Sequence, residues 1–340
     1  MYWDINRTLS YNRLFNFVVG QRGNGKTYGS KVWALKRFDK TGEEFIYLRR
    51  YEAERELVGP KYCKDIQDLV FSEGRTAYVD KSGKKILLGA WNPAKERYEN
   101  VVQAGHIMSL TKMTDLKSMS FPDVGTIIYD EFLLENTGVH HYLKEEPRVF
   151  LNFYETIARM RDVRVFFLAN AISVNNPYFS YFKLHLPFGT NITTKNEILL
   201  ELVENKEFTE AKKATRFGSI IAGTKYEEYS VENKFVYDLN SFIGKPTGNL
   251  NYVYTMVYCD KKYGFWEEGQ RERGWLTRKI DPSCKMVFAT TTEDHEPNRL
   301  LLDSPKVNWP YELMLKYHRY GLLWFDCLET KADFIKMAGL

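Results

Sequence analysis

Eight residues near the amino terminus of this 340-residue chain constrain its fold more than any other feature. Residues 20–27 read GQRGNGKT and match the pattern G-x-x-x-x-G-K-T at every fixed position. The apolar residues 14–19 predict a buried strand before this loop, and Tyr28, Val32 and Leu35 have helical spacing after it. Such a turn directs backbone N–H groups towards phosphate at a helix N-terminus. The segment therefore predicts a strand, a phosphate-binding loop and a helix.

The residue types in the loop indicate ATP with Mg²⁺ as the ligands. Lys26 is expected to reach the β- and γ-phosphate oxygens, and the hydroxyl of Thr27 to ligate Mg²⁺. Arg22 either contacts the γ-phosphate or is a solvated loop arginine, and the sequence leaves both open. The expected nucleotide-binding residues are Gly20, Gln21, Arg22, Gly23, Asn24, Gly25, Lys26, Thr27 and Tyr28.

About a hundred residues later, a second apolar run ends in two acids, Asp130 and Glu131. At the carboxyl end of a strand, Asp130 is placed to hold Mg²⁺ through water, and Glu131 to orient and deprotonate an attacking water. The adjacent glutamate favours hydrolysis over phosphoryl transfer to a second nucleotide. The sequence also lacks the N-K-x-D pattern of guanine recognition. The alternative is that these acids lie at a strand end by chance and have no function. The phosphate loop earlier in the chain argues against that alternative.

Further apolar runs of strand length predict an α/β protein with a mostly parallel, doubly wound sheet. They occupy residues 45–50, 106–110 and 163–170, and residues 80–83 predict a hairpin turn. We expect the strand at 106–110 to lie between the strands that carry the two motifs, as in the additional-strand class of P-loop ATPases. Asn170, at the end of a strand near the expected γ-phosphate, is either a sensor of hydrolysis or a turn cap.

A helix with apolar residues at 150, 153, 154 and 157 precedes three arginines. Ring-forming ATPases stabilise transition-state charge with a cation from the neighbouring subunit. At 100° per residue, Arg159 lies nine residues from Phe150 and points away from the apolar face, so it is the first choice for this arginine finger. Arg161 is the second choice, because it returns to the buried side unless the helix has already ended. A solvated arginine is the alternative for both.

Composition and patterning predict three segments: an ATPase domain at 1–205, a polar linker or lid at 206–243, and a smaller α+β domain at 244–340 containing an antiparallel meander. Four separated cysteines favour neither a zinc site nor a disulfide framework. We also expect no membrane span.

The net charge of +4 is too small to identify a nucleic-acid binder by itself. A local basic patch would have to make phosphate contacts, although each lysine taken singly is more often a solvated charge. The candidates for contacts with DNA are Arg49, Arg50, Lys81, Lys84, Lys85, Lys112 and Lys117.

The order of these motifs resembles the DNA-packaging ATPases of small tailed phages whose genomes carry a covalent terminal protein. The matching segments are LSYNRLFNFVVGQRGNGKTY, FIYLRRY, FPDVGTIIYDEF, VRVFFLANAISVNNPYF and KKATRFGSIIAGTKYEEYS, in the family's order over the amino-terminal two-thirds of the chain. The last third matches mainly in pattern.

The resemblance implies a homo-oligomeric ring, a pentamer, at the portal vertex of a procapsid in the host cytoplasm. There it would use ATP to move double-stranded DNA inward past the portal. Arg159 falls at the position of the family's trans-acting arginine. The carboxy-terminal domain would be a degenerate, inactive RNase H-like nuclease. Some members of the family dock through it on a structural packaging RNA, and the sequence leaves such a partner open.

Two other readings remain at this point. The chain could be a different ring-forming P-loop ATPase, such as a helicase, another translocase or a phage-assembly ATPase, or it could be a nucleotide-dependent scaffold without catalysis. The intact set of Lys26, Asp130 and Glu131 weakens the scaffold. Stimulation of ATP hydrolysis by duplex rather than single-stranded DNA would separate the packaging motor from a helicase.

Overall fold

The computed structural model describes residues 2–116, 119–134, 141–170, 176–184, 186, 190–203, 205–222, 224, 242–269, 273–301, 309–320 and 322–338. The chain forms two compact units. The first contains Met1–Leu184 and Asn191–Val236, and the second contains His185–Thr190 and Tyr237–Leu340. The division into segments 1–205, 206–243 and 244–340 stays a prediction.

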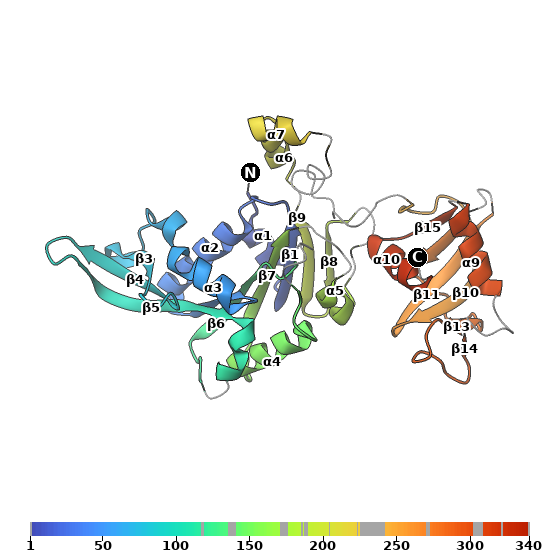
Figure 1. Ribbon diagram of the computed structural model, residues 1–340, viewed down its shortest axis with the longest axis horizontal. Coiled ribbons are helices and arrows are strands. Elements are labelled where there is room, and N and C mark those ends of the chain that lie inside the picture. Colours follow the sequence, from blue (N-terminus) through green and yellow to red (C-terminus); the bar gives the residue numbers. More distant parts are fainter. Residues whose placement is uncertain are drawn as a thin grey trace. The chain divides into compact units, whose positions relative to one another are not determined.

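The first unit is built on one nine-stranded sheet, shown in Figure 1. Six neighbouring strands are parallel, and antiparallel strands extend the sheet at both edges. This is the mostly parallel α/β sheet that the alternating apolar runs predict. In spatial order the strands are β3 (Thr76–Val79), β4 (Lys85–Asn92), β5 (Arg97–Ser109), β2 (Glu44–Arg49), β6 (Val124–Asp130), β7 (Arg164–Asn170), β1 (Phe15–Gly20), β9 (Ile198–Val203) and β8 (Ile192–Lys195).

Our expected spatial order was wrong for one strand. The strand that lies between β1 and β6 is β7, which pairs in parallel with both. The run at 106–110 is instead the end of the long strand β5, beyond β2. Position along the chain does not fix position in a sheet, because a crossover helix lets a strand return on either side. The additional-strand class holds, with β7 as the added strand.

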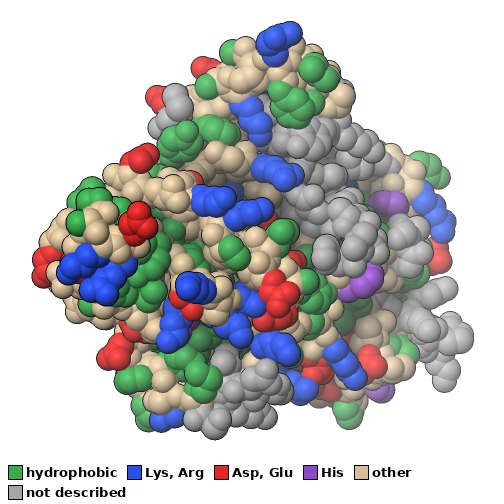
Figure 2. Space-filling view, turned by 60° about the vertical axis from the view of Figure 1, so that its left-hand side comes forward, with side chains coloured by type: hydrophobic (Ala, Val, Ile, Leu, Met, Phe, Trp, Pro, Cys, Tyr) green, Lys and Arg blue, Asp and Glu red, His purple; other side chains and the backbone are tan. Residues whose placement is uncertain are grey.

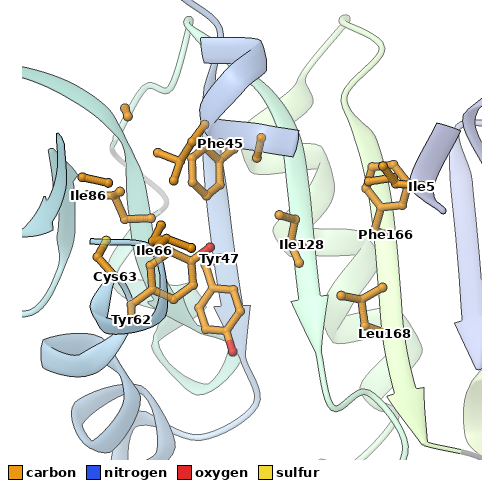
Figure 3. Close-up of a cluster of buried hydrophobic side chains, with 14 of the residues drawn as sticks. Ile5, Phe45, Tyr47, Tyr62, Cys63, Ile66, Ile86, Ile128, Phe166 and Leu168 are labelled. Atoms are coloured by element: carbon orange, nitrogen blue, oxygen red, sulfur yellow. The ribbon is translucent and has the colours of Figure 1, made fainter. Parts of the chain in front are cut away.

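Helices cover both faces of this sheet because its central strands are apolar on both faces. Phe166 and Leu168 of β7 belong to a buried apolar cluster (Figure 3). Leu35 of α2 belongs to the same cluster. Phe167, which points the other way, packs on Phe150 of α4. The helices of this unit are α1 (Ile5–Ser10), α2 (Lys26–Thr41), α3 (Glu52–Val58), α4 (Glu146–Ala158), α5 (Pro177–Phe182), α6 (Lys206–Lys213) and α7 (Arg216–Ile221), with short 3-10 turns at Gly59–Lys61, Lys64–Ile66, Ser72–Gly74 and Leu110–Leu116.

The second unit contains a six-stranded mixed sheet around its own apolar core of residues such as Tyr254, Phe265 and Phe334. Three central strands form the expected antiparallel meander, but the next strand, β13, pairs in parallel, so the sheet is not a simple meander. Parallel strands extend the meander on both sides. The elements are β14 (Leu300–Leu301), β13 (Val287–Ala289), β10 (Leu250–Tyr258), β11 (Lys261–Glu268), β12 (Arg273–Thr277), β15 (Leu323–Phe325), α9 (Trp309–Arg319) and α10 (Leu328–Met337).

The carboxylates of the second unit do not form a metal site where the structure describes them. No group of three or more His, Cys, Asp or Glu residues there, or elsewhere in the described chain, could hold a metal ion. Asp294 accepts hydrogen bonds from the backbone N–H groups of Cys259 and Asp260, and Asp281 accepts from Ser283. These carboxylates stabilise local turns, and the inactive nuclease-like domain stays a prediction.

Candidate nucleotide-binding site

The phosphate loop lies at the carboxyl edge of the parallel strands. It links β1 to α2, and two of its glycines have left-handed backbone angles, with φ of 86° at Gly23 and 83° at Gly25. Residues with a side chain rarely adopt such angles, which explains the glycines. Neighbouring strands end at the same edge, so Asn170 of β7 lies directly opposite Gly20 in the register. The edge therefore collects the ends of several strands around one loop.

Lys26 lies buried inside this loop. Its Nζ donates to the carbonyl oxygens of Gly20 at 3.0 Å and Gln21 at 2.9 Å and to Oδ1 of Asn24 at 3.1 Å. Burial lowers the pKa of the ammonium to about 7; Asp130 opposes this shift and Lys212 adds to it. These three acceptors are neutral oxygens, so an anionic phosphate would be a stronger partner.

Thr27 and Asp130 meet although 103 residues separate them. The threonine Oγ1 donates to Oδ2 of Asp130 at 3.0 Å, and the hydroxyl of Tyr47 donates to the same oxygen at 2.8 Å. Burial raises the pKa of the Asp130 carboxyl, and the guanidinium of Arg49 opposes this shift. A buried carboxylate beside a hydroxyl is an all-oxygen donor set of the kind that Mg²⁺ prefers. These two residues fit the metal that the sequence predicts.

Glu131 follows with its side chain 60% exposed, and it pairs with Arg49. The distance from Nη2 of Arg49 to Oε2 of Glu131 is 2.6 Å, and Nε of Arg49 lies 3.4 Å from Glu54 of α3. Arg49 is thus buried among carboxylates and does not face outward as a DNA contact. Its place at the end of β2 suggested phosphate or DNA as partners, and the pairing with Glu131 was not foreseen.

Arg50 is also not available to DNA, which corrects the sequence-based expectation. Only 1% of it is exposed, and its Nε donates to Glu146 at 2.8 Å. Its other nitrogens donate to the carbonyl oxygens of Glu131 and Phe132 at 3.1 and 2.6 Å. Arg50 therefore anchors the backbone next to Glu131. Nothing in the sequence around Arg49 and Arg50 indicates that these two arginines have different partners.

The helix before the arginine cluster ends earlier than the geometric argument for Arg159 required. α4 ends at Ala158, and Arg159 follows with φ 52° and ψ −111°, exposed to solvent. Arg161 donates to the carbonyl oxygens of Phe121, Pro122, Val124 and Ile157. Arg159 is thus accessible because the chain has left the helix, whereas Arg161 fastens that turn to the rest of the domain.

Three of the predicted DNA-binding lysines line one pocket at the other end of the sheet. Lys84, Lys85 and Lys112 surround a cavity of about 830 Å³ whose other lining includes Arg55 and Glu52. Figure 2 shows Lys and Arg side chains gathered over this side of the molecule, with acidic side chains among them. Lys81 lies in the same hairpin but outside the lining, and Lys117 lies outside the described residues.

One contributor to the site had no sequence motif. Helix α6 lies against the phosphate loop: Nε2 of Gln21 donates to Oγ1 of Thr209 at 2.5 Å, and Nζ of Lys212 donates to the carbonyl oxygen of Arg22 at 3.1 Å. About 190 residues separate these partners. The lysine-rich composition of the segment predicted a linker or lid, and its second half lies in a segment that resembles the packaging ATPases, but neither signal predicted contact with the phosphate loop.

The comparisons with known proteins agree with this geometry. The family described as Podovirus DNA encapsidation protein (Gp16) matches residues 1–337. The chain belongs to this family. It is 36% identical to the DNA packaging protein of Bacillus phage B103 over 328 residues, which cover 94% of each chain.

Solved structures extend the comparison to the fold. A chain of the bacteriophage phi29 viral genome packaging motor assembly superposes with a TM-score of 0.64 and 30% identity, over 99% of both chains. The N-terminal domain of the DNA packaging ATPase of phage phi29 covers 61% of this chain and 98% of its own length, with a TM-score of 0.52 and 33% identity. The chain is therefore a genome-packaging motor subunit of the phage packaging-ATPase type, which decides against the helicase and assembly-ATPase alternatives.

Among the helices of the described residues, none combines the length and the apolar character that a bilayer span requires.

Proposed function

We propose that this encapsidation protein hydrolyses ATP with Mg²⁺ at the phosphate loop and uses the free energy to move double-stranded DNA into a procapsid. The observation that carries the proposal is the meeting of Lys26, Thr27, Asp130 and Glu131 at one edge of the sheet. The 3.0 Å contact between Thr27 and Asp130 joins the phosphate loop to the acidic pair. A purely structural loop would not require this convergence.

Each residue has a distinct role in this proposal. Residues 20–28 bind the nucleotide, Lys26 neutralises its terminal phosphates, and Thr27 and Asp130 hold Mg²⁺, which supplies charge neutralisation when bound. Glu131 accepts the proton of the attacking water. The ion pair with Arg49 holds this carboxylate away from that role until the site is occupied. Asn170, opposite Gly20, reports the state of the γ-phosphate.

The remaining roles concern the assembly. We assign Arg159 as the finger that enters the site of a neighbouring subunit in a pentameric ring, because it is exposed while Arg161 is engaged with backbone carbonyls. The ring would act at the portal vertex of a procapsid in the host cytoplasm. A structural RNA bound through the second unit remains a proposal of the same kind. The pocket around Lys84, Lys85 and Lys112 would contact DNA phosphates without regard to sequence.

The decisive experiment is ATP hydrolysis measured with duplex DNA, with single-stranded DNA and without DNA. We expect turnover that duplex DNA stimulates most. Lys26→Ala should abolish nucleotide binding, whereas Glu131→Gln should bind ATP and lose about 10²- to 10⁴-fold in turnover, because only the proton acceptor is removed. Undiminished turnover in Glu131→Gln would remove its assigned role, and absence of hydrolysis in the wild type with DNA would reject the proposal.

The same variants test the finger. Mixing Arg159→Ala subunits with Glu131→Gln subunits should restore part of the activity, because some interfaces then combine an intact arginine with an intact glutamate. No recovery at any mixing ratio would show that Arg159 does not act between subunits.

A further inference from the structure

Helix α6 contacts three consecutive residues of the phosphate loop through one face. Thr209 accepts the hydrogen bond from Gln21, and Lys212 donates to the carbonyl oxygen of Arg22. The ring of Phe208 lies 3.6 Å from the point where a Cβ on Gly23 would sit. Three side chains from one helix thus reach the loop expected to surround the phosphates.

Cationic side chains lie close together at this contact. Lys26, Arg22 and Lys212 bring three cations to the loop, and Asp130 is the anion that acts on Lys26. Lys212 is half-buried while the next residue, Lys213, is exposed. An ammonium that donates to a neutral carbonyl beside two other cations gains less than one that meets an anion, since charge-assisted hydrogen bonds are about twice as strong as neutral ones. A polyphosphate would relieve this repulsion.

We propose that Lys212 is a phosphate-contacting residue of the nucleotide site, whose ammonium leaves the Arg22 carbonyl and binds a β- or γ-phosphate oxygen when nucleotide enters. This deepens the proposed function and rests on it. The carbonyl that now accepts from Lys212 belongs to the loop itself, so the ammonium lies close to where the phosphates are held. Through Lys212, the contact between α6 and the nucleotide would depend on how many phosphates the nucleotide carries.

The helix does not depend on Lys212 for its position. The Gln21–Thr209 hydrogen bond and the packing of Phe208 remain when Lys212 is replaced, and Asn205 caps the helix by accepting from the N–H of Phe208. Replacing Lys212 by methionine keeps the length and apolar part of the side chain and removes its charge. The variant therefore isolates the ammonium from the docking of α6.

The test compares Lys212→Met with Lys213→Met in binding ATP, ADP and AMP, each with Mg²⁺, by calorimetry. We expect Lys212→Met to weaken the affinity for ATP about 10-fold or more, because a charged hydrogen bond is lost. The affinity for AMP should change by less than about 2-fold. Lys213→Met should bind all three as the wild type does. Equal loss for ATP and AMP, or no loss for ATP, would overturn the assignment.

A second measurement needs no variant. Reductive methylation of wild-type protein should slow at Lys212 in the presence of ATP but not AMP, while the rate at Lys213 stays unchanged; protection by both nucleotides or by neither would overturn the assignment. Failure of the proposed function gives a different pattern. In that case ATP is not hydrolysed, yet the selective loss of ATP affinity in Lys212→Met can still be measured.

Discussion

Two neighbouring residues of the same type are both buried in this protein but have different partners. Arg49 ends β2 and pairs with the side chain of Glu131, whereas Arg50, the next residue, pairs with Glu146 and two backbone carbonyls. Glu146 is itself fully buried and accepts hydrogen bonds from Tyr129 and Tyr178. A buried carboxylate with this many donors is stable as long as its cation is present.

Arg50→Met should therefore reduce the free energy of unfolding by about 3–5 kcal/mol, because it leaves the charge of Glu146 buried without a cation. Urea denaturation measures the change. Arg97→Met is the matched control: Arg97 is 66% exposed and its ion pair with Glu99 should contribute less than about 1 kcal/mol. If the two variants lose equal stability, the buried pair does not hold this part of the domain together.

At the scale of elements, the end of α4 gives Arg159 and Arg161 different environments, which the helical pattern could not distinguish. The helix stops at Ala158, and the next residue adopts a backbone conformation that costs about 1–3 kcal/mol in a residue with a side chain. Arg161 then ties the turn to the loop before β6 through several carbonyls. The turn presents Arg159 at the cost of local strain.

Substitutions of the two arginines at this turn test its strain and its anchoring separately. Arg159→Gly should be more stable than Arg159→Ala by about 1 kcal/mol, because glycine adopts positive φ without strain, while both lose the finger. Arg161→Ala should lose about 1 kcal/mol, because partly buried carbonyls lose their donor. Thermal unfolding measures the stability of each variant, and ATP hydrolysis by mixed subunits measures the loss of the arginine finger. Equal stability of the glycine and alanine variants at position 159 would mean that the turn is not strained.

At the scale of the whole molecule, the small net charge of +4 hides a local excess of positive charge. Lys84 lies in the turn just before β4, Lys85 is the first residue of β4 and Lys112 lies in the 3-10 turn after β5, and the sheet brings all three to one pocket. The two arginines that the sequence also offered for DNA are buried in ion pairs instead. We infer that this pocket, and not the end of β2, contacts the DNA backbone.

Replacing Lys84 and Lys85 together by alanine should weaken duplex binding and reduce its salt dependence. Each lost phosphate contact lowers the slope of log K against log salt concentration by about 0.9. The control replaces Lys81 and Lys95 by alanine, which removes the same charge at the two turns that flank β4 but outside the pocket. Filter binding over a range of salt concentrations gives both slopes. An equal change in the two double variants would indicate general surface charge and not a site.

The sequence by itself determined the features that depend on neighbouring residues. The phosphate loop, the acids Asp130 and Glu131, the amphipathic helix before Arg159 and the hairpin around residues 80–83 were predicted because spacing and turn chemistry are local properties. The family was also recognisable from the order of these motifs, as the match over residues 1–337 confirms.

Only the tertiary structure decided which distant groups meet. It placed β7 between β1 and β6, paired Arg49 with Glu131 and Arg50 with Glu146, and brought α6 onto the phosphate loop. The residues in these contacts are up to about 190 positions apart, and no local periodicity records such pairing. Their positions follow from how the whole sheet is assembled and from the requirement that every buried charge find a partner.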